Sequence, residues 1–489
     1  MVQHATIKTK SINCRNFING EFIEATDGKV FENINPATEE VIGWVAEATR
    51  EDVDAAVQSA KAALKGTWGK FTVKERSQLL RRIGDLILEN VEELAALEAT
   101  DTGKPYHLAL EMDIKRAAHN FHFFADYVTS LGNESYNQDN MALHYSVTRP
   151  VGVVAMINPW NLPLLLLTWK LAPCLAAGST AVMKPAELTP MTATRLVELC
   201  QEAGVPDGVV NLVHGFGGNS AGAFLSEHPD VDAITFTGET KTGTTIMRAA
   251  APTLKKVSFE LGGKNPNIIF KDSDLDEVLA TTLKSSFMNQ GQVCLCGSRI
   301  YVERDIYEEF VEKFVARTKE LKIGDPFDAT TDIGSVVGKE HYEKVMGYIQ
   351  IAREEGGNIL TGGGRPANRD KGYYIEPTII TGLTDHNRCV REEIFGPVVT
   401  VLPFDTEDEV IARANDTNYG LGATIWTNDL RRAHRVAGQI ESGIVWVNTW
   451  YLRDLRTPFG GMKHSGIGRE GGAHSFEFYC EVSNVTIKL

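Results

Sequence analysis

The feature that most constrains the fold is a regular alternation of short apolar segments and amphipathic segments that begins after Pro150. The apolar segments have the length of buried strands, and the segments between them have the periodicity of helices. The first apolar segments read VGVVAMI, STAVMKP, GVVNLVHG, VDAITFTG and KKVSFELGG. Strands separated by helices form βαβ crossovers, which build a parallel sheet. The pattern predicts an α/β unit with a parallel sheet.

A second run of the same kind follows Gly262, with apolar segments such as PNIIF, VVTVLPF and GIVWVN. We therefore expect two parallel-sheet α/β domains, joined near the segment ELGGKNP. Two further β-like segments, MALHYSVTRP and EVSNVTIKL, have no evident partner in either sheet. We expect these two segments to pair in a small separate β ribbon between subunits.

Composition excludes several classes of protein. A net charge of −15 over 489 residues argues against nucleic-acid binding through phosphate neutralisation. The longest apolar run, which starts at Leu162, is interrupted by Pro163, Lys170 and Pro173, so we expect a buried helix and no membrane span. The first 16 residues lack the apolar core of a secretory signal, and seven irregularly spaced cysteines fit a reducing compartment. These features predict a cytoplasmic, multi-domain protein.

Three strand ends of the first run have the residues that a dinucleotide site needs. Two of them, VNLVHGFGGNSAGAF and AITFTGETKTGTTIM, lead through glycine turns into helices, whose N–H groups can meet a phosphate. The third offers Lys184 and Glu187, and a carboxylate there can accept bonds from ribose hydroxyls. Glu239 would repel a pyrophosphate, so it points to solvent or the phosphate is held elsewhere. The residues alone leave NAD and NADP both open.

The segment NQGQVCLCGSR places two cysteines one residue apart. A structural zinc site needs about four ligands, usually in two spaced pairs, and no second pair is present, so no metal is expected. A disulfide across one residue would be strained. What remains is a loop that presents one thiol as a candidate nucleophile, with Glu260 as a base and the amide of Asn161 as an oxyanion donor. These three residue types indicate acyl-type chemistry.

Six motifs occur in an order that resembles the NAD(P)-dependent aldehyde dehydrogenases. They are PWNLP at 159–163, FTGETKTG at 236–243, FELGGKNP at 259–266, NQGQVC at 289–294, EEIFGP at 392–397 and PFGGMKHSGIGRE at 458–470. Within that family the segments GQVCLC, WVNTWYLRDLRTPFGG and GREGG resemble the 2-hydroxymuconic and 2-aminomuconic semialdehyde dehydrogenases. The resemblance implies the fold of that family, with a thioester formed on Cys294 and hydrolysed with the help of Glu260.

The resemblance also implies a set of contacts to the cofactor, NAD or possibly NADP. The expected contact residues are Ile157, Pro159, Trp160, Lys184, Glu187, Gly217, Phe236, Gly238, Glu239, Thr242, Leu261, Glu393 and Phe395. His341 stands where the family commonly has a glutamine that contacts the ribose, so its role is left open.

The resemblance places the substrate between Arg116, Arg456 and Trp169. We expect the neighbouring Arg453 to pair with Asp454 in a structural role. Two arginines would favour a semialdehyde that carries a carboxylate, such as 2-hydroxymuconic or 2-aminomuconic semialdehyde. If these arginines point away, a broad-specificity enzyme for aromatic or apolar aldehydes is the alternative. A non-redox thiol hydrolase or acyltransferase is the alternative from another class.

The expected division of the chain follows from the same resemblance. Residues 1–127 and 151–262 form the dinucleotide-binding domain, residues 263–470 form the catalytic domain, and residues 128–150 and 471–489 form the oligomerisation ribbon. The expected partners are a small aldehyde and further copies of the chain in a homodimer or homotetramer, with no nucleic acid and no membrane.

Overall fold

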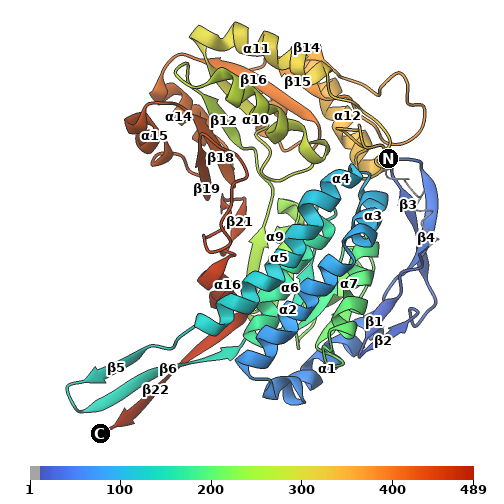
Figure 1. Ribbon diagram of the computed structural model, residues 1–489, viewed down its shortest axis with the longest axis vertical. Coiled ribbons are helices and arrows are strands. Elements are labelled where there is room, and N and C mark those ends of the chain that lie inside the picture. Colours follow the sequence, from blue (N-terminus) through green and yellow to red (C-terminus); the bar gives the residue numbers. More distant parts are fainter. Residues whose placement is uncertain (1–11) are drawn as a thin grey trace.

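The computed structural model describes residues 12–489 and contains two large sheets, which lie one above the other in the view of Figure 1. The first sheet has eight strands in the order β2-β1-β9-β8-β7-β10-β11-β21, and the five from β7 to β11 are mutually parallel. Its strands are β1 (Asn16–Ile18), β2 (Glu21–Ile23), β7 (Val153–Ile157), β8 (Thr180–Lys184), β9 (Val210–Leu212), β10 (Ala233–Thr237), β11 (Lys256–Glu260) and β21 (Gly466–Ile467).

Helices cover both faces of this sheet, which explains why every residue of β7, β8 and β10 is buried and why these strands read as continuous apolar runs. The helices of this unit are α1 (Arg50–Lys65), α2 (Val73–Glu89), α3 (Val91–Thr102), α4 (Tyr106–Leu108), α5 (Ile114–Tyr127), α6 (Pro163–Ala177), α7 (Met191–Glu202), α8 (Ala221–Glu227), α9 (Thr240–Ala250) and α16 (Gly472–Tyr479). Short helical turns join them at η1 (Trp68–Lys70), η2 (Ala109–Asp113), η3 (Val128–Ser130) and η4 (Ala251–Thr253).

The second sheet has seven strands in the order β14-β15-β16-β13-β12-β18-β19, and only the edge strand β14 is antiparallel to its neighbour. Its strands are β12 (Pro266–Ile269), β13 (Arg299–Glu303), β14 (Asn358–Thr361), β15 (Thr378–Thr381), β16 (Val398–Phe404), β18 (Gly422–Trp426) and β19 (Ile444–Val447). The helices of this unit are α10 (Leu275–Phe287), η5 (Met288–Gly291), α11 (Arg304–Lys319), α12 (Lys339–Glu354), α13 (Arg388–Arg391), α14 (Glu407–Asn415) and α15 (Leu430–Ala437).

The predicted α/β architecture with two parallel-sheet units is confirmed, and the chain passes from the first sheet to the second through residues 261–265. One strand crosses back. β21 comes from the part of the chain expected to belong to the second unit, yet it pairs with β11 through Phe259↔Ile467 and Glu260↔Gly466. This pairing brings the segment around residue 466 beside Glu260. Among residues 12–489, no helix combines the length and the apolar character that a bilayer span requires.

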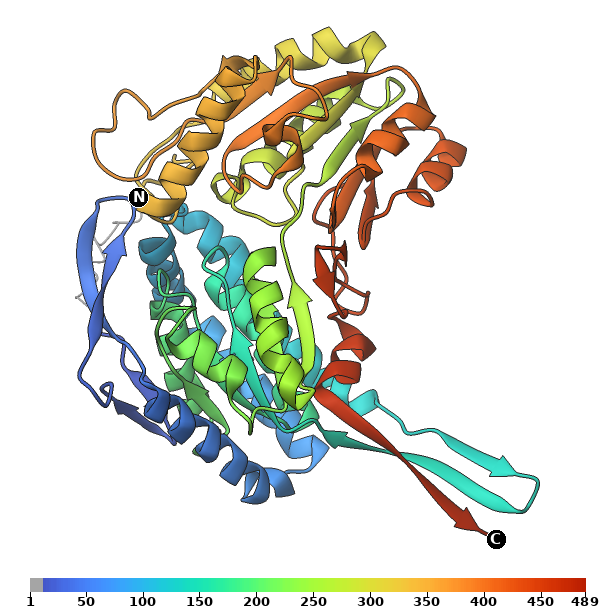
Figure 2. The ribbon, with the colours of Figure 1, turned by 180° about the vertical axis from the view of Figure 1, so that it is seen from behind.

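The ribbon projects away from both units (Figure 2). It consists of β5 (Ser135–Gln138), β6 (Ala142–Pro150) and β22 (Cys480–Lys488). β22 and β6 pair antiparallel along nine residues, from Cys480↔Pro150 to Lys488↔Ala142, which confirms the expected pairing of the two isolated segments. Two small sheets, β3 (Val30–Asn35) with β4 (Glu40–Ala46) and β17 (Tyr419–Gly420) with β20 (Met462–Lys463), complete the fold.

Candidate active site

Cys294 lies on a loop that leaves η5 through a tight reversal of the backbone. Asn289, Gln290 and Gly291 have φ angles of 53°, 57° and 69°, all in the left-handed region. A Cβ atom on Gly291 would collide with the carbonyl oxygen of Gly396, so the segment after α13 fixes a glycine here. The reversal turns the chain back and places Cys294 in the lining of a cavity.

Side-chain donors hold the carbonyl groups of this loop. The Asn161 Nδ2 donates to the Gln292 oxygen at 2.9 Å, and the Asn265 Nδ2 donates to the oxygens of Cys294 and Cys296 at 2.7 and 2.9 Å. The Trp450 indole donates to the Leu295 oxygen at 2.9 Å. Because these donors come from both units and from the linker between them, the position of the loop depends on how the two units are packed.

The surroundings of Cys294 favour the neutral thiol. Burial raises the pKa of Cys294 well above its usual value, and the nearby carboxylates of Glu260 and Glu393 raise it further, while its own backbone N–H opposes the shift. Attack by this sulfur therefore requires a base that removes its proton. The Cys294 N–H and the second Asn161 amide hydrogen are donors of the kind that stabilise a developing oxyanion.

Glu260 ends β11 and is 5% exposed. Neither carboxylate oxygen has a hydrogen-bond partner among the described residues, which leaves both available to a proton, a water or a thiol. Burial raises the pKa of Glu260 well above its usual value, and Glu470 adds to the shift, whereas Lys170, Arg453 and Arg469 oppose it. A carboxylate with a raised pKa is suited to act as a base near neutral pH.

A buried ion pair lies close to Glu260. Lys170 from α6 donates to Glu470 at 2.7 Å, with the lysine side chain fully buried. The two residues are 300 positions apart, so no local motif links them. Sequence reasoning missed both, although a lysine within the apolar run of α6 was a signal that a partner had to exist.

Cys294 lines a cavity whose wall also includes two arginines and several apolar side chains. The lining residues are Arg116, Asn120, Leu162, Leu165, Leu166, Trp169, Val293, Cys294, Leu295, Trp446, Tyr451, Arg453, Leu455 and Phe459. The Arg453 guanidinium carbon lies 4.1 Å from the Trp169 ring centre and 3.9 Å from that of Phe459, so the cation is held between two aromatic rings. Arg116 lies over Tyr451 at 4.8 Å.

Two of the three guanidinium nitrogens of Arg453, Nε and Nη2, are buried without a hydrogen-bond partner among the described residues. Burial lowers the pKa of Arg453 to about 10, with Arg116 as the next cause. Two cations beside one thiol make this cavity suited to an anionic group.

The expectation for Arg456 is corrected. Its side chain is 73% exposed, it pairs with Asp454 at 2.6 Å, and it does not line the cavity. The two arginines have exchanged their expected roles. Arg453 lines the cavity, where Arg456 was expected, and Arg456 pairs with Asp454, where Arg453 was expected. The reason is local, because Asp454 also accepts from the Arg456 backbone N–H in a tight turn. Arg116 and Trp169 lie in the cavity as expected.

The expected cofactor residues of the first sheet lie at the carboxyl ends of its strands. Ile157 ends β7, Lys184 ends β8, and the Lys184 Nζ lies 3.7 Å from Glu187. Next to Ile157, both side-chain polar atoms of Asn158 are buried without a partner among the described residues. Gly217 lies in the exposed turn that precedes α8.

The turn from β10 into α9 leaves the first N–H groups of a helix open. Glu239 is the residue before α9, it is exposed, and its side chain makes no capping hydrogen bond. Phe236 packs under Gly238, and Leu261 packs against Gly243, so the turn is supported from below. Thr242 is exposed in the first turn of the helix. Uncapped N–H groups at a helix start suit a phosphate.

The segment after α13 approaches the turn after β7. The Glu393 Oε1 accepts from the Gly263 N–H at 3.0 Å, and His341 bonds the carbonyl oxygen of Phe395 at 2.7 Å. Trp160, next to Pro159, lies 4.8 Å from His341 and 5.3 Å from Phe395 between ring centres. Burial lowers the pKa of His341 to about 4, so this ring is neutral. His341 thus lies beside Trp160 and Phe395, two of the residues expected at the cofactor site.

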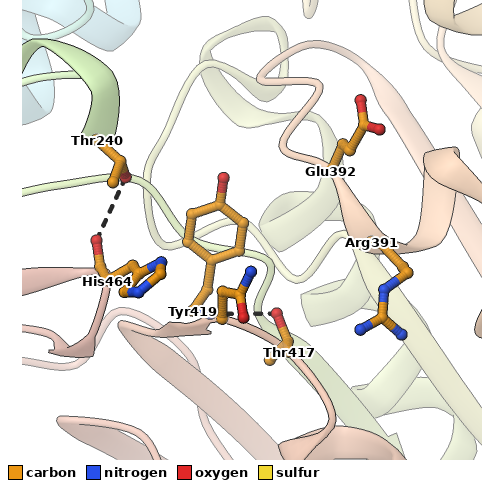
Figure 3. A pocket seen from close by; sticks show the side chains of 7 residues that line it. Thr240, Arg391, Glu392, Thr417, Tyr419 and His464 are labelled. Carbon is orange, nitrogen blue, oxygen red and sulfur yellow. Dashed lines mark hydrogen bonds between the residues drawn. The ribbon is translucent and has the colours of Figure 1, made fainter.

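A further cavity of about 280 Å³ opens between the start of α9 and the segment after α13 (Figure 3). It is lined by Thr240, Arg391, Glu392, Thr417, Asn418, Tyr419 and His464. The Thr240 hydroxyl donates to the His464 oxygen at 3.3 Å across its floor. The cavity contains neither Cys294 nor Glu260, but it borders the segments that carry Glu239 and Glu393.

Comparison with known proteins agrees with this geometry. The model of the aldehyde dehydrogenase family matches residues 22–485. The chain belongs to the aldehyde dehydrogenase family. It is 54% identical to a 2-hydroxymuconic semialdehyde dehydrogenase of Pseudomonas sp. strain CF600, over 97% of this chain and 99% of that protein. It is 51% identical to a 2-aminomuconic 6-semialdehyde dehydrogenase of a Pseudomonas species, over 97% and 98%.

A solved structure is similar in shape over nearly the whole chain. The NAD⁺ complex of an aldehyde dehydrogenase from Bacillus cereus superposes with a TM-score of 0.96 at 44% identity, over 98% of each chain. Membership in the aldehyde dehydrogenase family removes the alternative of a non-redox thiol hydrolase or acyltransferase. Within residues 12–489 no group of three or more His, Cys, Asp or Glu side chains is placed to hold a metal ion.

The environment of Glu260 predicts how activity of this aldehyde dehydrogenase depends on pH. Glu260 must be ionised to act as a base, so kcat/KM falls as pH drops through its raised pKa. Glu470→Gln removes a like charge and frees Lys170, and both changes lower the pKa of Glu260. The acidic limb of the kcat/KM profile is therefore expected to move to lower pH. Glu477→Gln, at an exposed position of α16, is the control. A limb that stays in place or moves to higher pH would contradict this assignment.

Proposed function

We propose that this aldehyde dehydrogenase oxidises a semialdehyde that carries a carboxylate, of the 2-hydroxymuconic or 2-aminomuconic semialdehyde type, with NAD⁺. The observation that carries the proposal is the presence of Arg116 and Arg453 in the same cavity as Cys294. The relatives at 54% and 51% identity, which are named for these two substrates, support it.

The burial of Arg453 favours a carboxylate over an apolar group. Trp169 and Phe459 cover the faces of its guanidinium, but its edge keeps two unpartnered donors. A carboxylate can accept two parallel hydrogen bonds from such an edge, whereas an apolar aldehyde would leave these donors unpaired in a desolvated site. The broad-specificity alternative is therefore disfavoured. The apolar walls of the cavity suit the unsaturated carbon chain of a muconic semialdehyde.

Each catalytic residue has a proposed role. Glu260 takes the proton of Cys294, and the thiolate sulfur forms a bond to the aldehyde carbon. The Cys294 N–H and the Asn161 amide stabilise the oxyanion, a contribution of about 3 kcal/mol per well-placed donor. When bound, NAD⁺ supplies the hydride acceptor that no side chain can replace. Glu260 releases the proton taken from Cys294 to solvent and, ionised again, takes a proton from the water that hydrolyses the thioester on Cys294.

The residues at the strand ends fit a bound dinucleotide. Lys184 and Glu187 would hold the adenosine ribose, the start of α9 would hold the pyrophosphate, and Glu393 and Phe395 would hold the nicotinamide ribose. The partnerless polar atoms of Asn158 and the uncapped helix start support such an occupant. Glu187 favours NAD⁺ over NADP⁺, because its carboxylate would repel a 2′-phosphate and already neutralises Lys184.

We also propose that the unit built on the first sheet binds the dinucleotide, that the unit built on the second sheet supplies the nucleophile, and that the ribbon joins copies of the chain into a homodimer or homotetramer. Apolar side chains on the ribbon support the last point. Tyr136, Met141, Val482, Ile487 and Leu489 are all exposed in the single chain. Exposed apolar residues on a projecting ribbon are typical of an interface.

The two arginines of the turn before Phe459 offer a matched test of substrate choice. Arg453→Met keeps the contacts with the two rings and removes the charge. We expect the KM for 5-oxopentanoate to rise about 30- to 100-fold, the loss of a charge-assisted pair, while the KM for pentanal stays within about 2-fold. Arg456→Met should leave both values unchanged. Equal changes for the two aldehydes in Arg453→Met would overturn the carboxylate proposal.

The proposed assembly is tested by charging the ribbon. Val482→Lys combined with Ile487→Lys places two cations where each apolar side chain is exposed in the single chain. Light scattering after gel filtration should report a smaller species, with an unchanged far-UV spectrum. Leu254→Lys, at a site that is 90% exposed on the first unit, is the control. An unchanged mass for the ribbon variant would contradict assembly through this ribbon.

A further inference from the structure

We propose that Lys104 is a positioning residue for the oxyanion site. Its ammonium group hydrogen-bonds the main-chain carbonyl group of Asn161, the residue whose side-chain amide is the proposed oxyanion donor. The Lys104 Nζ donates to the Asn161 carbonyl oxygen at 3.1 Å and to the Asp113 Oδ2 at 2.6 Å, and it lies 3.5 Å from the Glu98 Oε1. Three acceptors thus surround the three hydrogens of one ammonium group. The inference rests on the role of Asn161 in the proposed function.

The cluster is fully buried. The side chains of Lys104, Glu98 and Asp113 have no exposed surface. Burying an ion pair costs desolvation energy that its attraction often fails to repay, and apolar side chains of similar size frequently stabilise a fold as well. A contribution to stability therefore explains this cluster poorly. Its contact with Asn161, whose amide bonds the Cys294 loop, explains it better.

Glu98 holds the other end of the same turn. Its Oε2 accepts from the Leu164 N–H at 3.4 Å, in the first turn of α6. Helix α6 begins without a side-chain cap and without an acidic residue in its first turn, so Glu98 supplies from α3 what the local sequence lacks. Residues 161–164 are thus fixed at both ends by one buried cluster.

The cluster also connects to the nucleophile loop. The Asn161 oxygen that accepts from Lys104 accepts from the Asn289 Nδ2 as well, at 3.0 Å. The residue before Lys104 is Gly103, whose oxygen accepts from the Ser335 N–H at 3.1 Å and from the Gln290 Nε2 at 3.3 Å. The turn at 103–104 therefore touches both the oxyanion donor and the strained reversal that presents Cys294.

Asp113 links the cluster to the substrate cavity. It ends the π-helical turn η2, and such turns often re-aim side chains at functional sites. Its Oδ1 is buried without a partner among the described residues, so Lys104 is its main compensation. Arg116, three residues further along, lines the cavity with Cys294. The irregular turn η2 thus directs the Asp113 carboxylate to Lys104, and the start of the helix that follows it places the Arg116 guanidinium in the substrate cavity.

The test removes the pair as a whole. Lys104→Met with Asp113→Leu removes both members of the 2.6 Å pair, so Asp113 is not left unpaired, and Glu98 keeps its bond from the Leu164 N–H. Pentanal is the substrate, so that the result does not depend on the carboxylate proposal. We expect kcat to fall about 10- to 100-fold, as for a misplaced catalytic group, with the KM for NAD⁺ unchanged. Asp101→Asn, a buried carboxyl on α3 that bonds Asn33 and the Met191 N–H and does not touch Asn161, is the matched control and should keep kcat.

A double-mutant cycle with Asn161→Ala separates positioning from general damage. The carbonyl that Lys104 holds remains in Asn161→Ala, and only the amide is lost. If Lys104 acts through that amide, adding the Met/Leu pair to Asn161→Ala causes no further loss of kcat. Multiplied losses, or a Met/Leu enzyme with normal kcat, would overturn the inference. A silent Asn161→Ala would instead overturn the proposed role of Asn161 itself.

Asp113→Asn provides a second variant if the Met/Leu protein does not fold. It keeps the shape and an oxygen that accepts from Lys104, and it weakens the hold on the ammonium group. A smaller loss of kcat, again absent in the Asn161→Ala background, is the expected result. An equal loss in both backgrounds would overturn the inference.

Discussion

The hydrogen bonds that hold the carbonyl groups of residues 292–296 are the constraint on which the site depends. Two left-handed residues other than glycine, Asn289 and Gln290, store backbone strain before this segment, and only fixed partners keep such a conformation in place. Those partners are Asn161, Asn265 and Trp450, one from the first unit, one from the linker and one from the second unit. The packing of the two units against each other therefore determines where the sulfur atom of Cys294 lies.

Buried charges of both signs lie near that sulfur. Glu260 lies close to the pair of Lys170 and Glu470, and the Glu470 carboxylate raises the affinity of Glu260 for a proton. Arg116 and Arg453 line the cavity that contains Cys294, and the Arg453 cation opposes the effect of Glu470 on Glu260. A base and two cations near one nucleophile suit the proposed oxidation of an acidic aldehyde.

Much of this could be read from the sequence, for identifiable reasons. Parallel strands covered on both faces read as apolar runs, so the two sheets and the strand ends that carry Lys184 and Glu260 were predictable. Cys294 and Asn161 lay in motifs. The choice between Arg453 and Arg456 was not predictable, because these residues lie in a turn without periodicity and the Asp454 pairing decides which one turns outward. The contact of Lys170 with Glu470, like the return of β21 to the first sheet, depends on long-range packing.

The most direct measurement of the central claim is peptide mapping by mass spectrometry of the Glu260→Gln enzyme after reaction with NAD⁺ and 5-oxopentanoate. Without the base, hydrolysis of the thioester should stall, while the sulfur is still able to react at a pH high enough to ionise it. The account predicts an acyl adduct on Cys294 that forms only when NAD⁺ is present, with Cys296 unmodified. An adduct on Cys296, or an unmodified protein that still produces the carboxylate at the normal rate, would contradict it.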